Sequence, residues 1–280
     1  MKKHKEKIKG SIRENIELMS TPLMSILPGQ ISFFVILSII PMASILFMCI
    51  SKLSFNFQSV AGAINHYLPA AASSLMLSIF DQQKAGAIDV IFIITAFYLA
   101  AKATHSVIIA STQIYGGKQK DFFSTRIKAI IMLLILILLS IIVLGVFTIG
   151  SRFVTYLSTV NGTISPFVLQ TYMILKWPFV IFMIFISLKI IYTIAPNVNI
   201  PSRSVNKGAL ITTFGWVIST YAYSFYVSNM ANYTKFYGNL SNLIISFIWL
   251  YWLSYIFVFG MTFNEYRFSN KKLVSNKSLD

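Results

Sequence analysis

Residues 129–150 read AIIMLLILILLSIIVLGVFTIG, a stretch without a single charged side chain. An α-helix rises about 1.5 Å per residue. The hydrocarbon core of a bilayer is about 30 Å thick, so about 20 apolar residues are enough to cross it. The stretch is therefore long enough to span a membrane. Since lipid offers no partner to unpaired backbone groups, we expect it to be a helix.

Five more apolar stretches accompany this one. The chain is 56% apolar and only 11% charged, whereas soluble domains carry about 25% charged residues. It therefore has too little charge to cover a water-facing surface. The predicted fold class is all-α, a polytopic membrane protein with a bundle of about six transmembrane helices. The predicted spans are residues 30–51, 88–109, 129–150, 174–195, 208–230 and 240–263.

The segments outside these spans have their own patterns. Residues 60–80 are apolar but interrupted by Pro69, so we expect an outer interfacial or re-entrant helix rather than a seventh span. Near the N-terminus, Ile8, Ile12 and Ile16 recur among Lys and Glu, a pattern typical of an amphipathic helix. The predicted domains are a cytoplasmic basic amphipathic segment at 1–29, the six-span membrane domain at 30–263, and a cytoplasmic basic tail at 264–280.

The basic residues predict the orientation of the chain in the membrane. The two ends and the loops after the second and fourth spans hold sixteen Lys and Arg, whereas the opposite side holds four. The positive-inside rule then places both termini in the cytoplasm. The net charge of +15 is explained by these topology signals, so we expect no nucleic-acid partner.

Polar side chains follow one face of the second predicted span. Lys102 lies about 21 Å along that helix from its start, within the inner half of the membrane. An ionisable side chain there costs at least about 2.5 kcal/mol and usually faces a cavity or the bundle interior. We therefore predict a substrate path for an anionic group, such as a lipid phosphate or an organic anion. Its candidate residues are Thr95, Tyr98, Lys102, His105 and Thr112.

A second interpretation of the same face stays open. Lys102 can snorkel to the cytoplasmic interface, with His105 packed beside it as a neutral partner. Elsewhere, Pro41 removes a hydrogen bond in the middle of the first predicted span, which predicts a kink. On the fifth span, Gly208, Gly215 and Ser219 share one small face, typical of helix packing.

The residues do not favour catalysis. The three histidines are predicted to lie inside, outside and within the membrane, at His4, His66 and His105 respectively. A hydrolytic or metal site needs several such side chains or carboxylates to meet. The single cysteine, Cys49, rules out an intrachain disulfide. We therefore predict no catalytic residue, no metal, no cofactor and no enzyme activity.

Three short motifs follow one another along the chain, and their order is informative. Residues 31–41 read ISFFVILSIIP, an aromatic-rich span that ends in Ser-x-x-Pro. Residues 191–196 read IYTIAP, followed by Gly208. Residues 237–240 read YGNL, followed by WLY at 249–251 and by Gly260. Together they resemble the YihY/BrkB family of inner-membrane proteins, historically labelled ribonuclease BN, over about residues 15 to 265.

The resemblance implies a six-span protein of the bacterial plasma (inner) membrane whose function is poorly defined across the family. Two features depart from the family pattern. The family often has Gly-Ala-Glu near the end of its last span, whereas this chain reads GMT at 260–262, with Glu265 three residues later. Lys102 stands where the family usually has a small or polar residue. The nuclease label is widely regarded as a misassignment.

Three functional hypotheses follow. The first is a transporter or lipid-handling protein for an anionic substrate, with membrane lipids as partners and anionic lipid at the cytoplasmic face. The second is a non-catalytic scaffold whose basic ends bind lipid or partner proteins. The third is a membrane-bound ribonuclease, which would require RNA cleavage by the purified protein. Whether the chain forms a homo-oligomer is left open.

Overall fold

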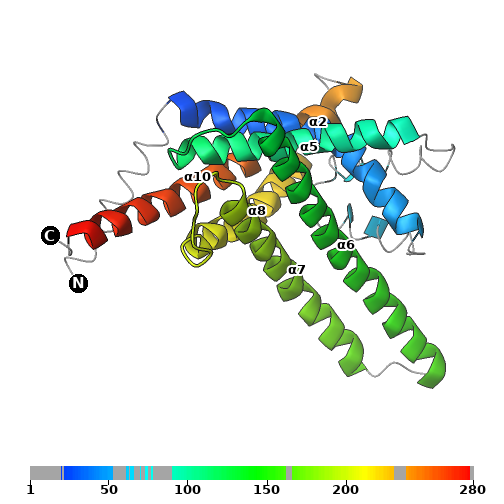
Figure 1. Cartoon of the computed structure of the whole chain (residues 1–280). Helices are drawn as coiled ribbons and strands as arrows, with labels where there is room; N and C mark the ends of the chain where they lie inside the picture. The colour runs from blue at the N-terminus through cyan, green and yellow to red at the C-terminus, as the bar shows by residue number, and fades with distance from the viewer. Residues whose placement is uncertain are drawn as a thin grey trace.

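All the regular secondary structure in the part that the structure describes is helical. The computed structural model describes residues 20, 22–52, 90–161, 166–229 and 238–277, with isolated positions between 61 and 77. Over these residues the elements are α2 (Pro22–Lys52), α5 (Val90–Ile114), α6 (Phe122–Asn161), α7 (Pro166–Ile194), α8 (Asn206–Asn229), the short η1 (Gly238–Leu240) and α10 (Ser241–Lys277) (Figure 1). The all-α prediction is confirmed.

Each predicted span overlaps one of the long helices. Three helices contain a segment long and apolar enough to cross a membrane, namely Phe122–Val146, Ile174–Ile194 and Ser241–Ser269. In α2 the apolar stretch Ser25–Ile39 is shorter. The chain is therefore an all-α membrane protein, while six spans stay a prediction. The 40 residues of α6 extend about 60 Å, twice the thickness of the hydrocarbon core.

Two predicted segments fall mostly outside the described residues. These are the outer helix at 60–80 and the amphipathic segment at the N-terminus. The described chain shows that α2 already begins at Pro22, ahead of the predicted boundary at residue 30. The side chains beyond residue 269 also lie outside the description, as do the basic ends on which the scaffold hypothesis depends.

The six long helices form a closed ring of contacts. In order, α2 packs on α5, α5 on α6, α6 on α7, α7 on α8, α8 on α10, and α10 back on α2. Figure 1 shows α2 and α5 side by side, and α6 and α7 as a hairpin that extends away from the other helices. Large apolar side chains are exposed along one side of α6, among them Ile131, Leu134 and Leu138. Such a stripe fits contact with lipid.

Small residues bring α8 and α10 into close contact. A Cβ atom at Gly208 would overlap the backbone carbonyl of Gly260, so the two backbones touch at this crossing. A Cβ atom at Gly215 would lie 2.7 Å from the Ile256 Cγ2 atom, also on α10. Gly208 and Gly215 therefore both face α10, and close approach of this kind is common between membrane helices. Ser219, the third residue of the predicted face, is half-buried.

Tyr192 connects three helices at the centre of the bundle. Its side chain is fully buried. The hydroxyl donates to the Phe257 carbonyl of α10 at 2.7 Å and shares a second hydrogen bond of 2.7 Å with the Thr212 hydroxyl of α8. Buried polar groups need such partners, since an unpaired one costs about 1–3 kcal/mol. The tyrosine therefore fixes α7 against α8 and α10.

Pro41 lies inside α2 and is buried, and Pro28 lies nearer the start of the same helix. Figure 1 shows α2 changing direction in its second half. A proline in a helix interior removes one hydrogen bond and crowds the preceding turn, which favours bending. The Ser38 hydroxyl, one turn earlier, donates to the Val35 carbonyl at 2.8 Å.

Several helix ends meet at one end of the bundle. The Tyr115 ring, just after α5, packs against Phe268 of α10 with 6.4 Å between ring centroids. The Gly208 amide at the start of α8 donates to the Asn264 side chain of α10 at 2.8 Å. The loops after α5 and α7 are therefore on the same end, as the charge count predicts for the cytoplasmic side.

Candidate functional site

Four side chains form a basic and aromatic cluster on α2, α5 and α6, and two of them, Tyr98 and Lys102, belong to the predicted stripe. The Lys102 ammonium nitrogen lies 5.6 Å from the centre of the Tyr98 ring and 6.0 Å from that of Phe34. The Arg126 guanidinium carbon lies 4.0 Å from the centre of the same Tyr98 ring. Arg126 also donates from Nη2 to the Tyr98 carbonyl at 2.8 Å. Two cations thus share one aromatic ring, an arrangement that cation–π attraction favours.

This cluster of Phe34, Tyr98, Lys102 and Arg126 lies on the outside of the helix ring. Tyr98 is 51% exposed. Apolar side chains around it on α2 and α5 are exposed as well: Phe33, Leu37, Ile94 and Leu99. In a membrane protein, an exposed apolar surface of this kind contacts lipid. The cluster therefore presents positive charge to the lipid, at the edge of the bundle.

The ammonium group of Lys102 carries three hydrogen-bond donors. Within the described part of the chain, none of them meets a hydrogen-bond acceptor or a carboxylate, and the side chain is half-buried. A lysine at membrane depth costs at least about 2.5 kcal/mol unless a partner offsets its charge. The site is thus suited to an anion that approaches from the lipid side.

The other described residues of the predicted stripe, His105 and Thr112, lie in different surroundings. His105 is half-buried, with its ring centroid 6.5 Å from that of Phe122 at the start of α6. Thr112 is fully buried and donates to the Ile108 carbonyl at 2.7 Å. Its hydroxyl also accepts the Asn197 amide of the loop after α7 at 3.2 Å. Thr112 therefore holds this loop and does not join the cluster. The Thr95 side chain lies outside the described residues.

The centre of the ring is apolar. A cavity of ≈ 190 Å³ is lined by side chains from all six long helices, including Ile31, Leu133, Trp216 and Phe257. Lys102 and His105 do not line it. Any polar path that used these two residues would therefore run along the outer surface of α5 rather than through the centre of the ring.

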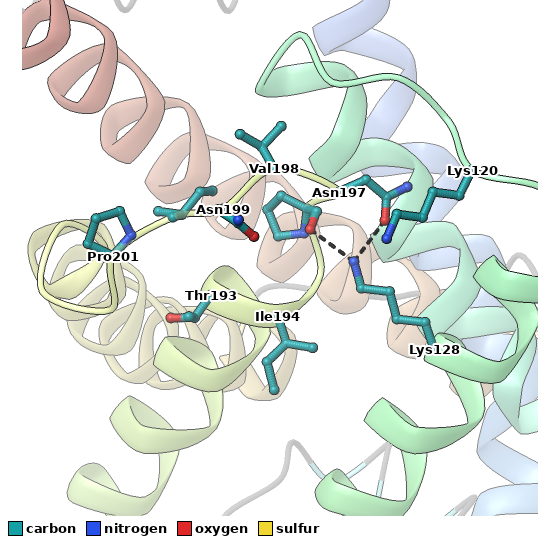
Figure 2. Close-up of a pocket in the computed structure, with 10 residues that line it drawn as sticks. Lys120, Lys128, Thr193, Ile194, Asn197, Val198, Asn199 and Pro201 are labelled. Carbon is teal, nitrogen blue, oxygen red and sulfur yellow. Dashed lines mark hydrogen bonds between the residues drawn. The ribbon is translucent and has the colours of Figure 1, made fainter.

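A second basic site lies between the start of α6 and the loop after α7. The open pocket there has a volume of ≈ 540 Å³ (Figure 2). Its lining combines two lysines with the segment that follows α7: Lys120, Lys128, Thr193, Ile194, Pro196, Asn197, Val198, Asn199, Ile200 and Pro201. Figure 2 shows the Lys120 and Lys128 side chains both directed toward Asn197.

Lys128 is held firmly in this pocket. Its ammonium nitrogen donates to the carbonyls of Ala195 and Pro196, each at 2.9 Å, and to the Asn197 Oδ1 atom at 2.8 Å. The first two oxygens lie just past the end of α7, where helix carbonyls lack intrahelical partners and carry partial negative charge. The lysine therefore caps α7 from α6.

Arg126, Lys120 and Lys128 were not predicted as site residues, because their charges fit the count of cytoplasmic loop residues. In the structure α6 begins at Phe122, so Arg126 and Lys128 belong to the helix. Two residues apart on a helix, they point to different neighbours. Arg126 contacts α5, and Lys128 contacts the loop after α7. In the sequence, only the position of Arg126 and Lys128 beside the apolar run could have indicated that they belong to the helix.

Other polar groups near this end are buried. The Tyr115 hydroxyl has no hydrogen-bond partner among the described residues, and the same holds for Asn264 Nδ2 and Asn206 Oδ1. Burial raises the pKa of Tyr115, and the nearby Glu265 charge raises it further, so this hydroxyl stays neutral. Among the described residues, no three His, Cys, Asp or Glu side chains are grouped as metal ligands.

A family model for virulence factor BrkB matches residues 23–278. The chain belongs to the BrkB family. This BrkB-family protein is 28% identical over 252 residues to ribonuclease-like protein YfkH of Bacillus subtilis, covering 88% of this chain and 90% of that one. It is 24% identical over 264 residues to a UPF0761 membrane protein of Alteromonas mediterranea, covering 89% and 85%.

A shorter match, 27% identical over 97 residues, joins it to a UPF0761 membrane protein of Yersinia enterocolitica and covers 33% of each chain. No solved structure matches this BrkB-family protein. The predicted resemblance is confirmed, and with it membership of a family of membrane proteins. The two UPF0761 names state no activity or substrate, whereas the name of YfkH describes that protein as ribonuclease-like.

Thiol labelling tests which part of α5 is accessible in this BrkB-family protein. In a Cys49→Ser background, a small thiol reagent that also enters the bilayer, such as N-ethylmaleimide, is expected to label a cysteine at Lys102 but not one at Thr112. Thr112 lies nearer the end of α5, yet it is fully buried beneath the loop after α7. A cysteine at the exposed Gln113 is the positive control. Labelling at 112 but not at 102 would contradict access from the outer surface.

Proposed function

We propose that this protein handles anionic lipid at the cytoplasmic leaflet of the bacterial plasma membrane, in a non-catalytic role. The cluster of Phe34, Tyr98, Lys102 and Arg126 receives the lipid head group. The observation that carries the proposal is the Lys102 ammonium, which faces the lipid side without an acceptor in the described part of the chain.

The chemistry of the cluster fits a phosphate group. Arg126 and Lys102 both lie close to the ring of one residue, Tyr98, so their charges act on the same place. Lysine and arginine both bind phosphate through charge-assisted hydrogen bonds, which are about twice as strong as neutral ones. Tyr98 is half exposed, and tyrosine is common where one side of a ring meets lipid and the other meets head groups.

The level of the cluster also fits a head group. Arg126 lies about one turn from the start of α6, at the end of the bundle that the charge count predicts to be cytoplasmic. The long Lys102 side chain can reach toward the same level by snorkelling. The snorkelling interpretation and the head-group site are therefore compatible, because the lipid phosphate lies where a snorkelling ammonium group would end.

Movement of labelled lipid between leaflets tests the proposal. Purified protein in liposomes is expected to redistribute fluorescent phosphatidylglycerol faster than fluorescent phosphatidylcholine. Changing Lys102→Met keeps the length of the side chain and removes its charge. We expect this variant to slow phosphatidylglycerol redistribution by about tenfold, because one charge-assisted contact of about 1.5 kcal/mol is lost.

Lys189→Met on α7 is the matched control, since it removes a membrane lysine outside the cluster. It is expected to redistribute phosphatidylglycerol at the rate of the unchanged protein. Equal rates for the Lys102 and Lys189 variants would show that the cluster does not receive the lipid. The proposal would also fail if the purified protein cleaved RNA and lost that activity on changing one defined residue.

A further inference from the structure

We propose that the pocket between α6 and the loop after α7 binds a phosphate group, independently of the lipid cluster on α5. Lys120 contacts the phosphate directly, and Lys128 supplies a fixed positive charge beneath it. The phosphate belongs either to an anionic lipid head group or to a small soluble phosphate ester. The pocket volume of ≈ 540 Å³ accommodates either one.

The charge of the pocket favours an anion. Its lining contains two lysines and, among the described residues, no Asp or Glu. Asp121 follows Lys120 in the sequence but does not line the pocket. The end of α7 contributes roughly −0.5 of an elementary charge against the two ammonium groups, which leaves about +1.5. A phosphate monoester carries about −1.5 to −2 near neutral pH, so it matches this charge.

The two lysines have different roles. The Lys128 ammonium group donates its three hydrogen bonds to Ala195, Pro196 and Asn197. It therefore acts on a ligand through its charge and cannot donate to it. Lys120 is exposed and makes no side-chain hydrogen bond or ion pair within the described chain. Its three donors are therefore free to reach a phosphate oxygen.

Neutral polar groups complete the lining. Asn197 and Asn199 contribute two side-chain amides, a kind of donor that accompanies lysine around a phosphate, whereas the Thr193 hydroxyl donates to the Lys189 carbonyl at 2.8 Å. The Asn197 Nδ2 atom is buried and has no hydrogen-bond partner among the described residues. Figure 2 shows Lys120 extending over Asn197. Movement of Lys120 onto a ligand would uncover this amide as a further donor.

Binding measurements on the full chain test the pocket and identify the source of the phosphate. In zwitterionic phosphatidylcholine nanodiscs, glycerol phosphate is titrated and followed by ³¹P NMR. In a second arm, the retention of phosphatidylglycerol over phosphatidylcholine after detergent extraction is measured by native mass spectrometry. In whichever of the two measurements detects binding, Lys120→Met is expected to weaken that binding by about tenfold, because one charge-assisted contact is lost.

Lys118→Met is the matched control. It removes the same charge from the same loop, and Lys118 does not line the pocket. We expect it to bind like the unchanged protein. Binding of glycerol phosphate identifies a soluble ester, and selective retention of phosphatidylglycerol identifies a lipid head group. No binding in either arm, or equal losses in the two variants, would overturn the proposal. In the lipid arm, the effect of Lys120→Met is measured in a Lys102→Met background, because the cluster on α5 also retains phosphatidylglycerol. A loss that persists in this background separates the pocket from the proposed function.

Discussion

Replacing Gly208 with alanine is expected to prevent stable packing of α8 on α10. The added Cβ atom would overlap the Gly260 carbonyl and the Asn264 side chain. The carbonyl is backbone and cannot rotate away, so the helices must separate. That separation breaks the 2.8 Å hydrogen bond from the Gly208 amide to Asn264. We expect the free energy of unfolding to fall by about 3 kcal/mol, the upper end of the usual range for overpacking.

Thermal unfolding in detergent and the yield of monodisperse protein measure this loss. Gly29→Ala on α2 is the matched control, because its added Cβ atom would lie 3.9 Å from the Tyr251 Cε2 atom, an ordinary contact. Alanine also favours a helix over glycine by about 0.5–1 kcal/mol. The melting temperature of the Gly29 variant should therefore stay the same or rise. Equal melting temperatures for the two variants would contradict the close crossing.

Gly215→Ala should lie between these two variants. Its Cβ atom would meet the Ile256 Cγ2 atom at 2.7 Å, and an isoleucine side chain has more room to adjust than a backbone carbonyl. Among the three alanine variants, the Gly29 variant is therefore expected to be the most stable, the Gly215 variant less stable and the Gly208 variant the least stable. The sequence indicates a small face on this helix, but only the structure shows how closely each glycine approaches α10.

The positions of the helices could be predicted because uninterrupted apolar stretches have few alternatives in a membrane. The ends of the helices could not. The start of α6 was expected at residue 129, where the apolar run begins, but the helix begins at Phe122. The charge count assigns Arg126 and Lys128 to the loop before this run. In the folded chain, Arg126 and Lys128 find an aromatic ring and carbonyl oxygens instead.

The candidate site was partly predictable for a similar reason. Helical spacing groups residues by their direction around α5, but it does not say which neighbour covers each one. The loop after α7 covers Thr112, whereas Tyr98 stays half exposed beside Arg126. Arg126 lies 28 positions away in the sequence. Contacts over such a separation depend on how the helices cross, and a single sequence does not give that angle.

Lys128→Met is expected to lower the free energy of unfolding by about 3 kcal/mol. Three oxygen atoms of the Ala195–Asn197 segment would lose a charged donor, and a hydrogen bond to a charged group contributes about 1.5–3 kcal/mol. Water can reach part of this open pocket and replaces some of the loss, which keeps the total below the sum of three bonds. Thermal unfolding in detergent measures the change.

The same variant should loosen the loop after α7 before the whole chain unfolds. The loop is tied to α6 through Lys128 and to α5 through Thr112. Losing the first tie leaves, among the described residues, the 3.2 Å hydrogen bond to Thr112 and the apolar packing of Ile200 and Val205. Trypsin should then cleave faster at the exposed Arg203 within that loop. Lys120→Met removes the same charge from the same pocket without breaking a hydrogen bond in the described chain, so its cleavage rate should match that of the unchanged protein. Equal cleavage of the two variants would mean that charge alone, rather than the cap on α7, holds the loop in place.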